Sequence, residues 1–235
     1  MSGVGARCQE RAGVGALGRT AGCWGMANVE RPGAQRWVPE GGGVRALRTA
    51  APACRGCELW APATQVVFSA GPSRARLVLV GEQPGDVEDR EGEPFVGPAG
   101  RVLDAALEAA GLNRDDVYLT NAVKHFRFIE RGPRRLHKAP AVVHLRACLP
   151  WLDAELAAVR PRVVVAMGTS AARAVLGHEV TIGEIRGRLL GERTPAVLVT
   201  AHPSSVLRQR ESGERHAALA ALVADLKVAA AAAAV

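Results

Sequence analysis

A basic segment with a single histidine holds the residues of this chain best suited to carry out a reaction. It spans residues 131–140 and reads Arg-Gly-Pro-Arg-Arg-Leu-His-Lys-Ala-Pro. Its cations are Arg131, Arg134, Arg135 and Lys138. Together they could bind the phosphates of a nucleic acid, and His137 places a nucleophile or an acid–base group among them. Most arginine-rich loops are solvated surface, so the segment alone leaves both interpretations open.

Three cysteines and a histidine could bind a metal. Cys54 and Cys57 have the C-x2-C spacing that zinc sites, redox dithiols and iron–sulfur ligands share. The pair precedes the first predicted strand, which argues against a thioredoxin-like redox pair. Cys148 could supply a third thiolate and His125 the fourth ligand. His144 is nearer to Cys148 in sequence, but it lies one turn away on the same predicted helix. By spacing alone, zinc and a [4Fe–4S] cluster fit equally well, and a chance pair beside a buried cysteine stays an alternative.

Regular elements must position these residues, and the chain alternates between strand and helix patterns. Short apolar runs predict strands at 76–81, 117–123, 162–168 and 196–201. Helical spacing predicts helices that begin at residue 98, span 142–159 and 169–176, and close the chain from about 211 to 227. This alternation predicts an α/β fold, a three-layer αβα sandwich around a mostly parallel four-stranded central sheet.

Polar segments follow three of the predicted strands. They are 81–86 (Gly-Glu-Gln-Pro-Gly-Asp), 120–125 (Thr-Asn-Ala-Val-Lys-His) and 201–204 (Ala-His-Pro-Ser). In open parallel sheets, ligands bind beyond the carboxyl ends of the strands. We therefore expect the three segments to meet at one edge of the sheet and to form a binding site.

Charge and composition favour a polyanionic partner. The chain has 235 residues, a formal net charge of +7 and a pI near 9.8, which favours nucleic acid. The density is highest in residues 124–138, where six Lys and Arg residues accompany one acid, Glu130. The five cysteines form an odd set in a chain without a secretory signal pattern, which argues against a disulfide framework.

The ends of the chain differ from its middle. Residues 1–48 are rich in Gly and Arg and are predicted to be a disordered extension, 49–229 to form one domain, and 230–235 to be an alanine-rich tail. No uninterrupted apolar run approaches the roughly 18 residues that cross a membrane. We therefore expect no membrane partner, a cytoplasmic location and a monomer.

Several segments together resemble the iron–sulfur uracil-DNA glycosylases. The matching segments are Cys54-Arg-Gly-Cys57, Gly81-Glu-Gln-Pro-Gly85, Gly92-Glu-Pro-Phe-Val-Gly-Pro-Ala-Gly100, Thr120-Asn-Ala-Val-Lys124 and His202-Pro-Ser204. Arg134-Arg-Leu-His-Lys-Ala-Pro140, with His125, is similar to the UdgX-type branch, which becomes covalently attached to its DNA. The resemblance covers about residues 50–227 and implies the uracil-DNA glycosylase fold.

The resemblance also implies a cofactor. Ordinary iron–sulfur members have Lys-Cys after the strand that carries the asparagine, whereas this chain has Lys124-His125, as the UdgX-type pattern does. His125 is then the fourth ligand beside the three cysteines. The likeness favours a structural [4Fe–4S] cluster over zinc.

The implied substrate is uracil-containing DNA, with single strands preferred. Uracil inside a duplex is unreachable, so the base must leave the stack. Phe95, in a loop-like setting that argues against burial, would stack on uracil, and Asn121 would bind its edge. The alternatives are a core phenylalanine and a capping asparagine. The backbone of Gln83 and Gly85 would complete the pocket. Ser204 and Ser205 would bind substrate and phosphate.

The implied reaction ends in a covalent bond. His202 would stabilise the departing uracil, and His137 would capture the sugar carbon. Glu82 would orient His137 or accept its proton, and Gln83 would help to exclude water. Arg134, Arg135 and Lys138 would hold phosphate and favour the uncharged imidazole. Two alternatives remain: a turnover glycosylase in which Glu82 or Asp86 activates water, and a cluster protein that only binds nucleic acid.

Overall fold

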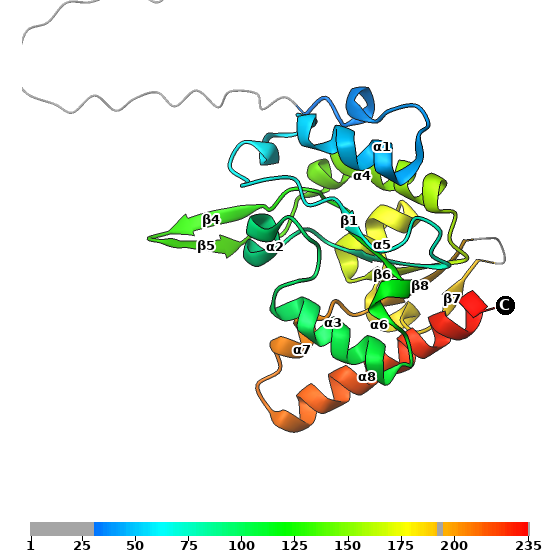
Figure 1. Cartoon of the computed structure of the whole chain (residues 1–235). Helices are drawn as coiled ribbons and strands as arrows, with labels where there is room; N and C mark the ends of the chain where they lie inside the picture. Colours follow the sequence, from blue (N-terminus) through cyan, green and yellow to red (C-terminus); the bar gives the residue numbers. More distant parts are fainter. Residues whose placement is uncertain (1–30, 192–194, 235) are drawn as a thin grey trace, which may run out of the picture.

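A six-stranded mixed sheet forms the centre of the molecule (Figure 1). The computed structural model describes residues 31–191 and 195–234. The strands are β1 (Ser69–Ala70), β2 (Leu77–Gly81), β3 (Tyr118–Asn121), β6 (Val163–Met167), β7 (Leu189–Leu190) and β8 (Ala196–Thr200). Their order is β1-β3-β2-β6-β8-β7. The central β3, β2, β6 and β8 are mutually parallel and confirm the four predicted strands, while β1 and β7 pair antiparallel at the edges.

The sheet has more strands than the four predicted. The two additional strands contain two residues each. Such short strands are below the length at which alternation can be recognised in a sequence. The architecture is otherwise as predicted, because the added strands only extend the sheet at its two edges.

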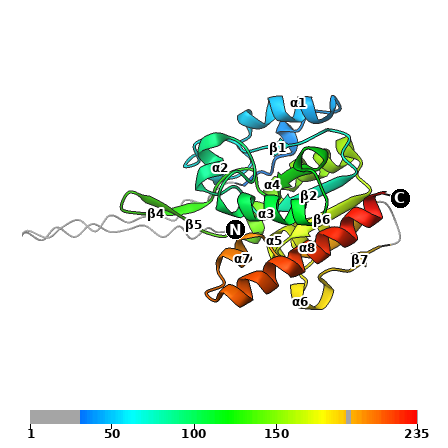
Figure 2. The same cartoon turned by 60° about the horizontal axis from the view of Figure 1, so that its bottom comes forward.

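Helices cover both faces of the sheet, which confirms the three-layer arrangement (Figures 1 and 2). One face carries α1 (Gly43–Ala50), α4 (Val142–Val159) and α5 (Thr169–Leu176); the other carries α3 (Pro98–Ala109) and α8 (Ser212–Ala234). Neighbouring residues of β2 point to opposite faces. Val78 and Val80 pack in the hydrophobic core between the sheet and α4, here called the first core. Leu77 and Leu79 pack in the second core, between the sheet and α8. Strand β2 is therefore apolar along its length, as a strand buried on both faces must be.

Shorter helices and turns connect these elements. They are the helices α2 (Asp86–Glu91), α6 (Ile182–Ile185) and α7 (Ser204–Leu207), and the 3-10 turns η1 (Gln35–Trp37), η2 (Ala51–Ala53), η3 (Glu58–Trp60) and η4 (Arg114–Asp116). Both α2 and α7 directly follow a central strand. They begin at the edge of the sheet where the polar segments were expected to meet.

The domain begins earlier and ends later than predicted. Helix α1 begins at Gly43, and its Val44 and Leu47 are buried in the first core, so the boundary at residue 49 is wrong. The glycines at 41–43 obscured this helix in the sequence. At the other end, α8 continues to Ala234 with Ala233 buried, so most of the expected tail is helix. Residues 31–42 of the expected extension are also described, and Ala34 is buried in the same core. Residues 1–30 lie outside the described residues.

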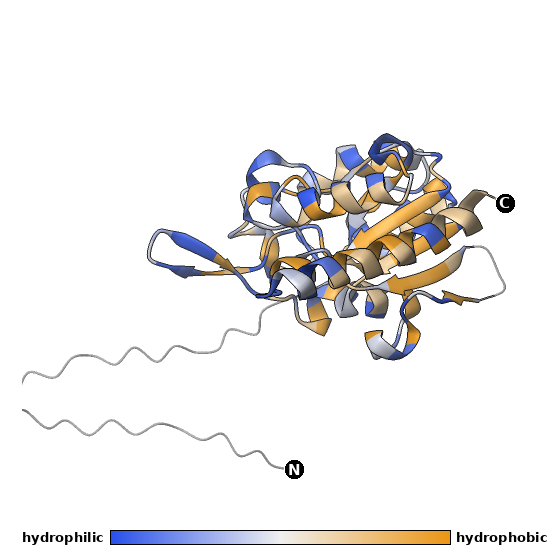
Figure 3. Cartoon of the chain, turned by 90° about the horizontal axis from the view of Figure 1, so that it is seen from below, coloured by the Kyte–Doolittle hydropathy of each residue, from blue (hydrophilic) through white to orange (hydrophobic). Residues whose placement is uncertain are grey.

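Helix α8 is long and apolar enough to cross a membrane by length and composition, with a mean hydropathy of 1.8 over its most apolar window. The segment contains no uninterrupted apolar run of that length, because Asp225 and Lys227 divide it. In the structure, Leu222, Leu226 and Ala229 are buried in the core beneath α8, and Figure 3 shows this helix lying across the apolar strands of the sheet. A core helix of an α/β domain passes the same test, so the expectation of no membrane partner stays a prediction.

The basic segment is a β-hairpin and not a loop. Strands β4 (Phe128–Arg131) and β5 (Arg134–His137) pair antiparallel, with Phe128 opposite His137 and Ile129 opposite Leu136. Gly132 has a positive φ of 58° at the turn between them. The hairpin projects beyond the body of the domain on the side of α2 (Figures 1 and 2). Because side chains alternate along a strand, His137 and Arg135 share one face of the hairpin.

Candidate functional site

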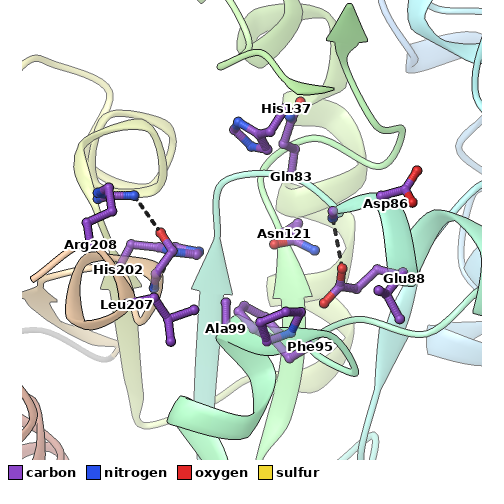
Figure 4. Close-up of a pocket in the computed structure, with 14 residues that line it drawn as sticks. Gln83, Asp86, Glu88, Phe95, Ala99, Asn121, His137, His202, Leu207 and Arg208 are labelled. Carbon is purple, nitrogen blue, oxygen red and sulfur yellow. Dashed lines mark hydrogen bonds between the residues drawn. The ribbon is translucent and has the colours of Figure 1, made fainter. Parts of the chain in front are cut away.

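A cavity of about 470 Å³ lies at the carboxyl edge of the central strands (Figure 4). Its lining contains residues from all three polar segments and from the hairpin, among them Gln83, Gly85, Asp86, Phe95, Asn121, His137, His202 and Ser204. The structure thus brings together the residues predicted to bind and react with a base. These residues come from distant parts of the chain, between the loop after β2 and the segment after β8.

Phe95 and Asn121 converge over Gly81, the last residue of β2. A Cβ atom on Gly81 would lie 2.3 Å from Asn121 Oδ1 and 2.6 Å from Phe95 Cζ, so only glycine fits between them. Asn121 is the last residue of β3 and pairs with Gly81 in the sheet. Phe95 has φ 59°, a strained value for a residue with a side chain. It is only 5 % exposed, so the expectation that its loop would keep it from burial is wrong, although it still lines the cavity.

Glu88 holds two walls of the cavity together and was not predicted from the sequence. Its Oε2 accepts a hydrogen bond from the amide of Gly85 at 3.1 Å, and its Oε1 accepts one from the amide of Gly97 at 2.8 Å. One wall carries the 81–86 segment and the other carries Phe95. The negative charge lies in the first turn of α2, where the helix dipole favours it.

His202 is uncharged at neutral pH. Burial, the cation of Arg208 and the nearby His137 lower its pKa to about 4. Arg208 donates to Ser204 Oγ at 2.9 Å, and that oxygen lies 2.9 Å from His202 Nδ1. The amide of Ser204 also donates to Nδ1, at 3.2 Å. Because Nδ1 accepts, the neutral ring carries its proton on Nε2 and can donate a hydrogen bond from there.

His137 lies beside the carboxylate of Glu82. Its Nε2 is 3.4 Å from Glu82 Oε1, and its side chain is 50 % exposed. The ring also approaches Phe126, with centroids 6.1 Å apart. Both His137 and His202 line a second cavity of about 330 Å³ that adjoins the first and includes Glu82, Ser205 and Arg208. His137 therefore lies where the two cavities meet and is accessible to a ligand.

Arg135 anchors the hairpin to helix α2. Its guanidinium donates to Asp86 Oδ1 and to Asp89 Oδ2, both at 2.6 Å, and to Thr64 Oγ1 at 3.1 Å. It also lies 5.0 Å from the centroid of the Phe128 ring. These ion pairs argue against the predicted role of Arg135 in binding phosphate, because two carboxylates already neutralise its charge. Asp86 is likewise held in ion pairs with Arg135 and Arg90, which argues against its predicted role in activating water.

The side chain of Gln83 fastens the base of the hairpin. Its amide group donates to the carbonyls of Arg127 at 3.1 Å and Lys138 at 3.2 Å, and its Oε1 accepts from the amide of Arg127 at 3.1 Å. These residues flank the two strands. The sequence indicated a role for the Gln83 backbone and for water exclusion; the structure adds a contact that positions His137 through its strand.

The basic surface is smaller than residues 124–138 indicate. Lys124 is buried and forms an ion pair with the buried Glu155, and it donates to the carbonyl of Asn121 at 2.9 Å. Lys124 therefore stabilises the end of β3, where Asn121 lines the cavity. Arg131, Arg134 and Lys138 are exposed and remain available to phosphate. Arg208 adds a cation that was not predicted, one helical turn after Ser204.

The four predicted metal ligands line one small buried cavity. Cys54, Cys57, His125 and Cys148 are all buried there, whereas His144 contacts Glu58 instead. Burial raises the pKa of the Cys57 thiol to about 11 and that of Cys148 to about 12, and lowers the pKa of His125 to about 4. Among residues 31–191 and 195–234, no three His, Cys, Asp or Glu side chains converge closely enough to hold a metal ion. Three free thiols and a neutral imidazole around one cavity still fit the donor set of a zinc or iron–sulfur site.

Comparison with known proteins identifies the fold. Residues 68–227 match the model of the uracil DNA glycosylase superfamily. The chain is 37% identical over 170 residues to the type-4 uracil-DNA glycosylase of Thermotoga maritima, covering 71% of this chain and 84% of that protein. It is 34% identical over 172 residues to the type-4 enzyme of Archaeoglobus fulgidus, covering 69% and 82%. The chain belongs to the uracil-DNA glycosylase superfamily.

Proposed function

We propose that this protein excises uracil from DNA and that His137 then captures the abasic sugar, in a single turnover. The observation that carries the capture is the position of His137, 3.4 Å from Glu82 and on the lining of the same cavity as Phe95, Asn121 and His202. The excision is supported by the superfamily match and by the names of the type-4 relatives.

Uracil would bind between an aromatic ring and an amide. Phe95 offers a π-face for the flat base, and Asn121 offers a donor and an acceptor to its edge. Glycine at position 81 leaves room for both side chains at the end of β2. The neutral His202 would donate from Nε2 to a uracil oxygen, where negative charge develops as the base departs.

The same geometry supports the proposed covalent step. The bond between sugar C1′ and uracil N1 breaks, and its electron pair leaves on uracil. The unprotonated ring nitrogen of His137 gives its lone pair to C1′ and forms the new bond. The alkylated ring loses its remaining N–H proton to Glu82, and solvent returns one proton to the uracil anion. The products are free uracil and a neutral histidine bonded to the DNA.

DNA would reach the site along the exposed cations of the hairpin. Arg131, Arg134 and Lys138 lie on the strand that carries His137 or beside it, and Arg208 and Ser205 line the adjoining cavity. Phosphates on both sides of the uracil could be held in this way. We propose a preference for single-stranded DNA, since extruding a base from a duplex costs a few kcal/mol.

We also propose that Cys54, Cys57, His125 and Cys148 hold a [4Fe–4S] cluster. The cluster would serve as a structural crosslink between the segment before β1, the segment after β3 and helix α4. Its ligands are buried, and His125 lies four residues after Asn121. No step of the reaction requires it.

A gel assay distinguishes capture from turnover. The protein is incubated with single-stranded DNA that contains one uracil, once with protein in excess and once with DNA in excess, and the products are run under denaturing conditions. Capture gives a shifted band that survives denaturant, and uracil release that stops at one equivalent of protein. A conventional glycosylase gives abasic product in excess over protein and no shifted band. A protein that only binds DNA leaves the uracil–sugar bond intact.

A further inference from the structure

Ser170 contacts the carboxylate that faces His137. It lies in the first turn of α5, directly after the turn at Gly168 that leaves strand β6. Its hydroxyl donates a hydrogen bond to Glu82 Oε2 at 2.5 Å. Gly168 has φ 89°, and a Cβ atom there would lie 3.1 Å from the Cβ of His202. A glycine at this turn thus lets α5 begin close to both His202 and Glu82.

The two oxygens of Glu82 have different partners. Oε2 accepts from Ser170, while Oε1 lies 3.4 Å from His137 Nε2. A carboxylate whose one oxygen is fixed has fewer rotamers available to the other. The Glu82 side chain is 23 % exposed, so without Ser170 it could turn toward solvent. Its place near the start of α5 also favours its negative charge.

We propose that Ser170 is a positioning residue for the capture step, because it holds Glu82 in the orientation that presents Oε1 to His137. This inference rests on the proposed function. The hydroxyl itself contacts neither uracil nor sugar. Its effect is transmitted through the carboxylate to the imidazole, in a chain of three side chains that come from α5, the loop after β2 and the end of β5.

The test is a comparison of single-turnover rates of adduct formation. Ser170→Ala removes the donor and should slow adduct formation on the order of tenfold, the scale of one hydrogen bond to a charged group. The half-saturating DNA concentration should stay unchanged, since Ser170 does not line either cavity. Ser170→Thr keeps the hydroxyl and should restore most of the rate. Thr49→Ala, which removes a hydroxyl on the distant helix α1, is the matched control.

A double-substitution cycle separates positioning from a purely structural role. In a Glu82→Ala background, Ser170→Ala should change the rate less than twofold, because the carboxylate it positions is gone. An equal loss of rate in both backgrounds would overturn the inference. If the wild-type protein forms the adduct and the single variant Ser170→Ala forms it at the same rate, the inference is overturned as well. A wild-type protein that forms no adduct would overturn the proposed capture, and this inference with it.

Discussion

Nε2 of His137 lies 3.4 Å from Oε1 of Glu82, although 54 residues separate the two in sequence. Glu82 follows a central strand of the sheet, whereas His137 ends a hairpin that projects from the domain. The histidine is thus brought to the cavity by the tethers of the hairpin and not by the sheet itself. These tethers and the cavity walls lead to four expectations.

The pair between Arg135 and the buried Asp89 should fix the position of His137. Asp89→Asn leaves the guanidinium with a weaker partner in a partly buried site, so we expect the free energy of unfolding to fall by about 2 kcal/mol. Adduct formation should slow about tenfold as the hairpin loosens. Urea unfolding and single-turnover rates measure the two effects. Asp104→Asn, at the exposed pair with Arg114, is the control and should cost less than about 1 kcal/mol. An unchanged rate in Asp89→Asn would refute the tether.

Gly100→Ala should damage the cavity although alanine favours helices. A Cβ atom at this position would lie 1.8 Å from the carbonyl oxygen of Phe95. In an open helix the change gains about 1 kcal/mol. Here we expect lower stability and weaker binding of uracil-containing DNA, because Phe95 must shift. Gly213→Ala in α8, where nothing lies within 4 Å, is the matched control and should be neutral or stabilising. Equal binding by the two variants would contradict this packing.

Stability should depend on the protonation of His202 in acid. The folded-state pKa is about 4, against an ordinary value of 6.5, so between these values the unfolded chain binds a proton that the folded chain excludes. Stability is therefore lost as the pH falls from about 6.5 toward 4. We expect His202→Gln to lose less stability than the wild type between pH 7 and pH 4.5, by on the order of 2 kcal/mol. Urea unfolding at both pH values measures the difference, and parallel losses would contradict the assigned burial.

Metal analysis should show whether His125 or His144 is the fourth ligand beside the cysteines. Protein purified without oxygen should contain about four iron atoms and four sulfides per chain if a [4Fe–4S] cluster is bound. His125→Ala should lose most of the iron, and His125→Cys should keep it. His144→Gln should keep it as well, since His144 contacts Glu58. One zinc per chain, or full iron in His125→Ala, would refute the proposed ligand set.

The central sheet could be predicted because its strands are buried on both faces and consist mostly of apolar residues. The site at its edge followed from the rule that parallel strands end together, and it placed Gln83, Asn121 and His202 correctly around one cavity. The hairpin could not be predicted in this way. Its strands alternate Arg, Glu, Ile and Leu without a buried face, and a Gly-Pro turn resembles a loop.

Contacts between distant side chains also escaped prediction. The partners of Arg135 are 46 and 49 residues away in the sequence, so the sequence predicts a contact with DNA where the structure has a tether between the hairpin and α2. Lys124 was counted in a basic surface, yet its partner Glu155 lies on a helix 31 residues later. A local density of charge does not reveal which charges are already paired.

Peptide mass spectrometry of the adduct tests the covalent capture most directly. After incubation with uracil-containing single-stranded DNA, the protein is digested with nuclease and protease, and the modified peptide is fragmented. We expect a deoxyribose phosphate on His137, no such mass in His137→Ala, and uracil released in a one-to-one ratio with modified protein. Unmodified His137 together with many equivalents of released uracil would contradict the account.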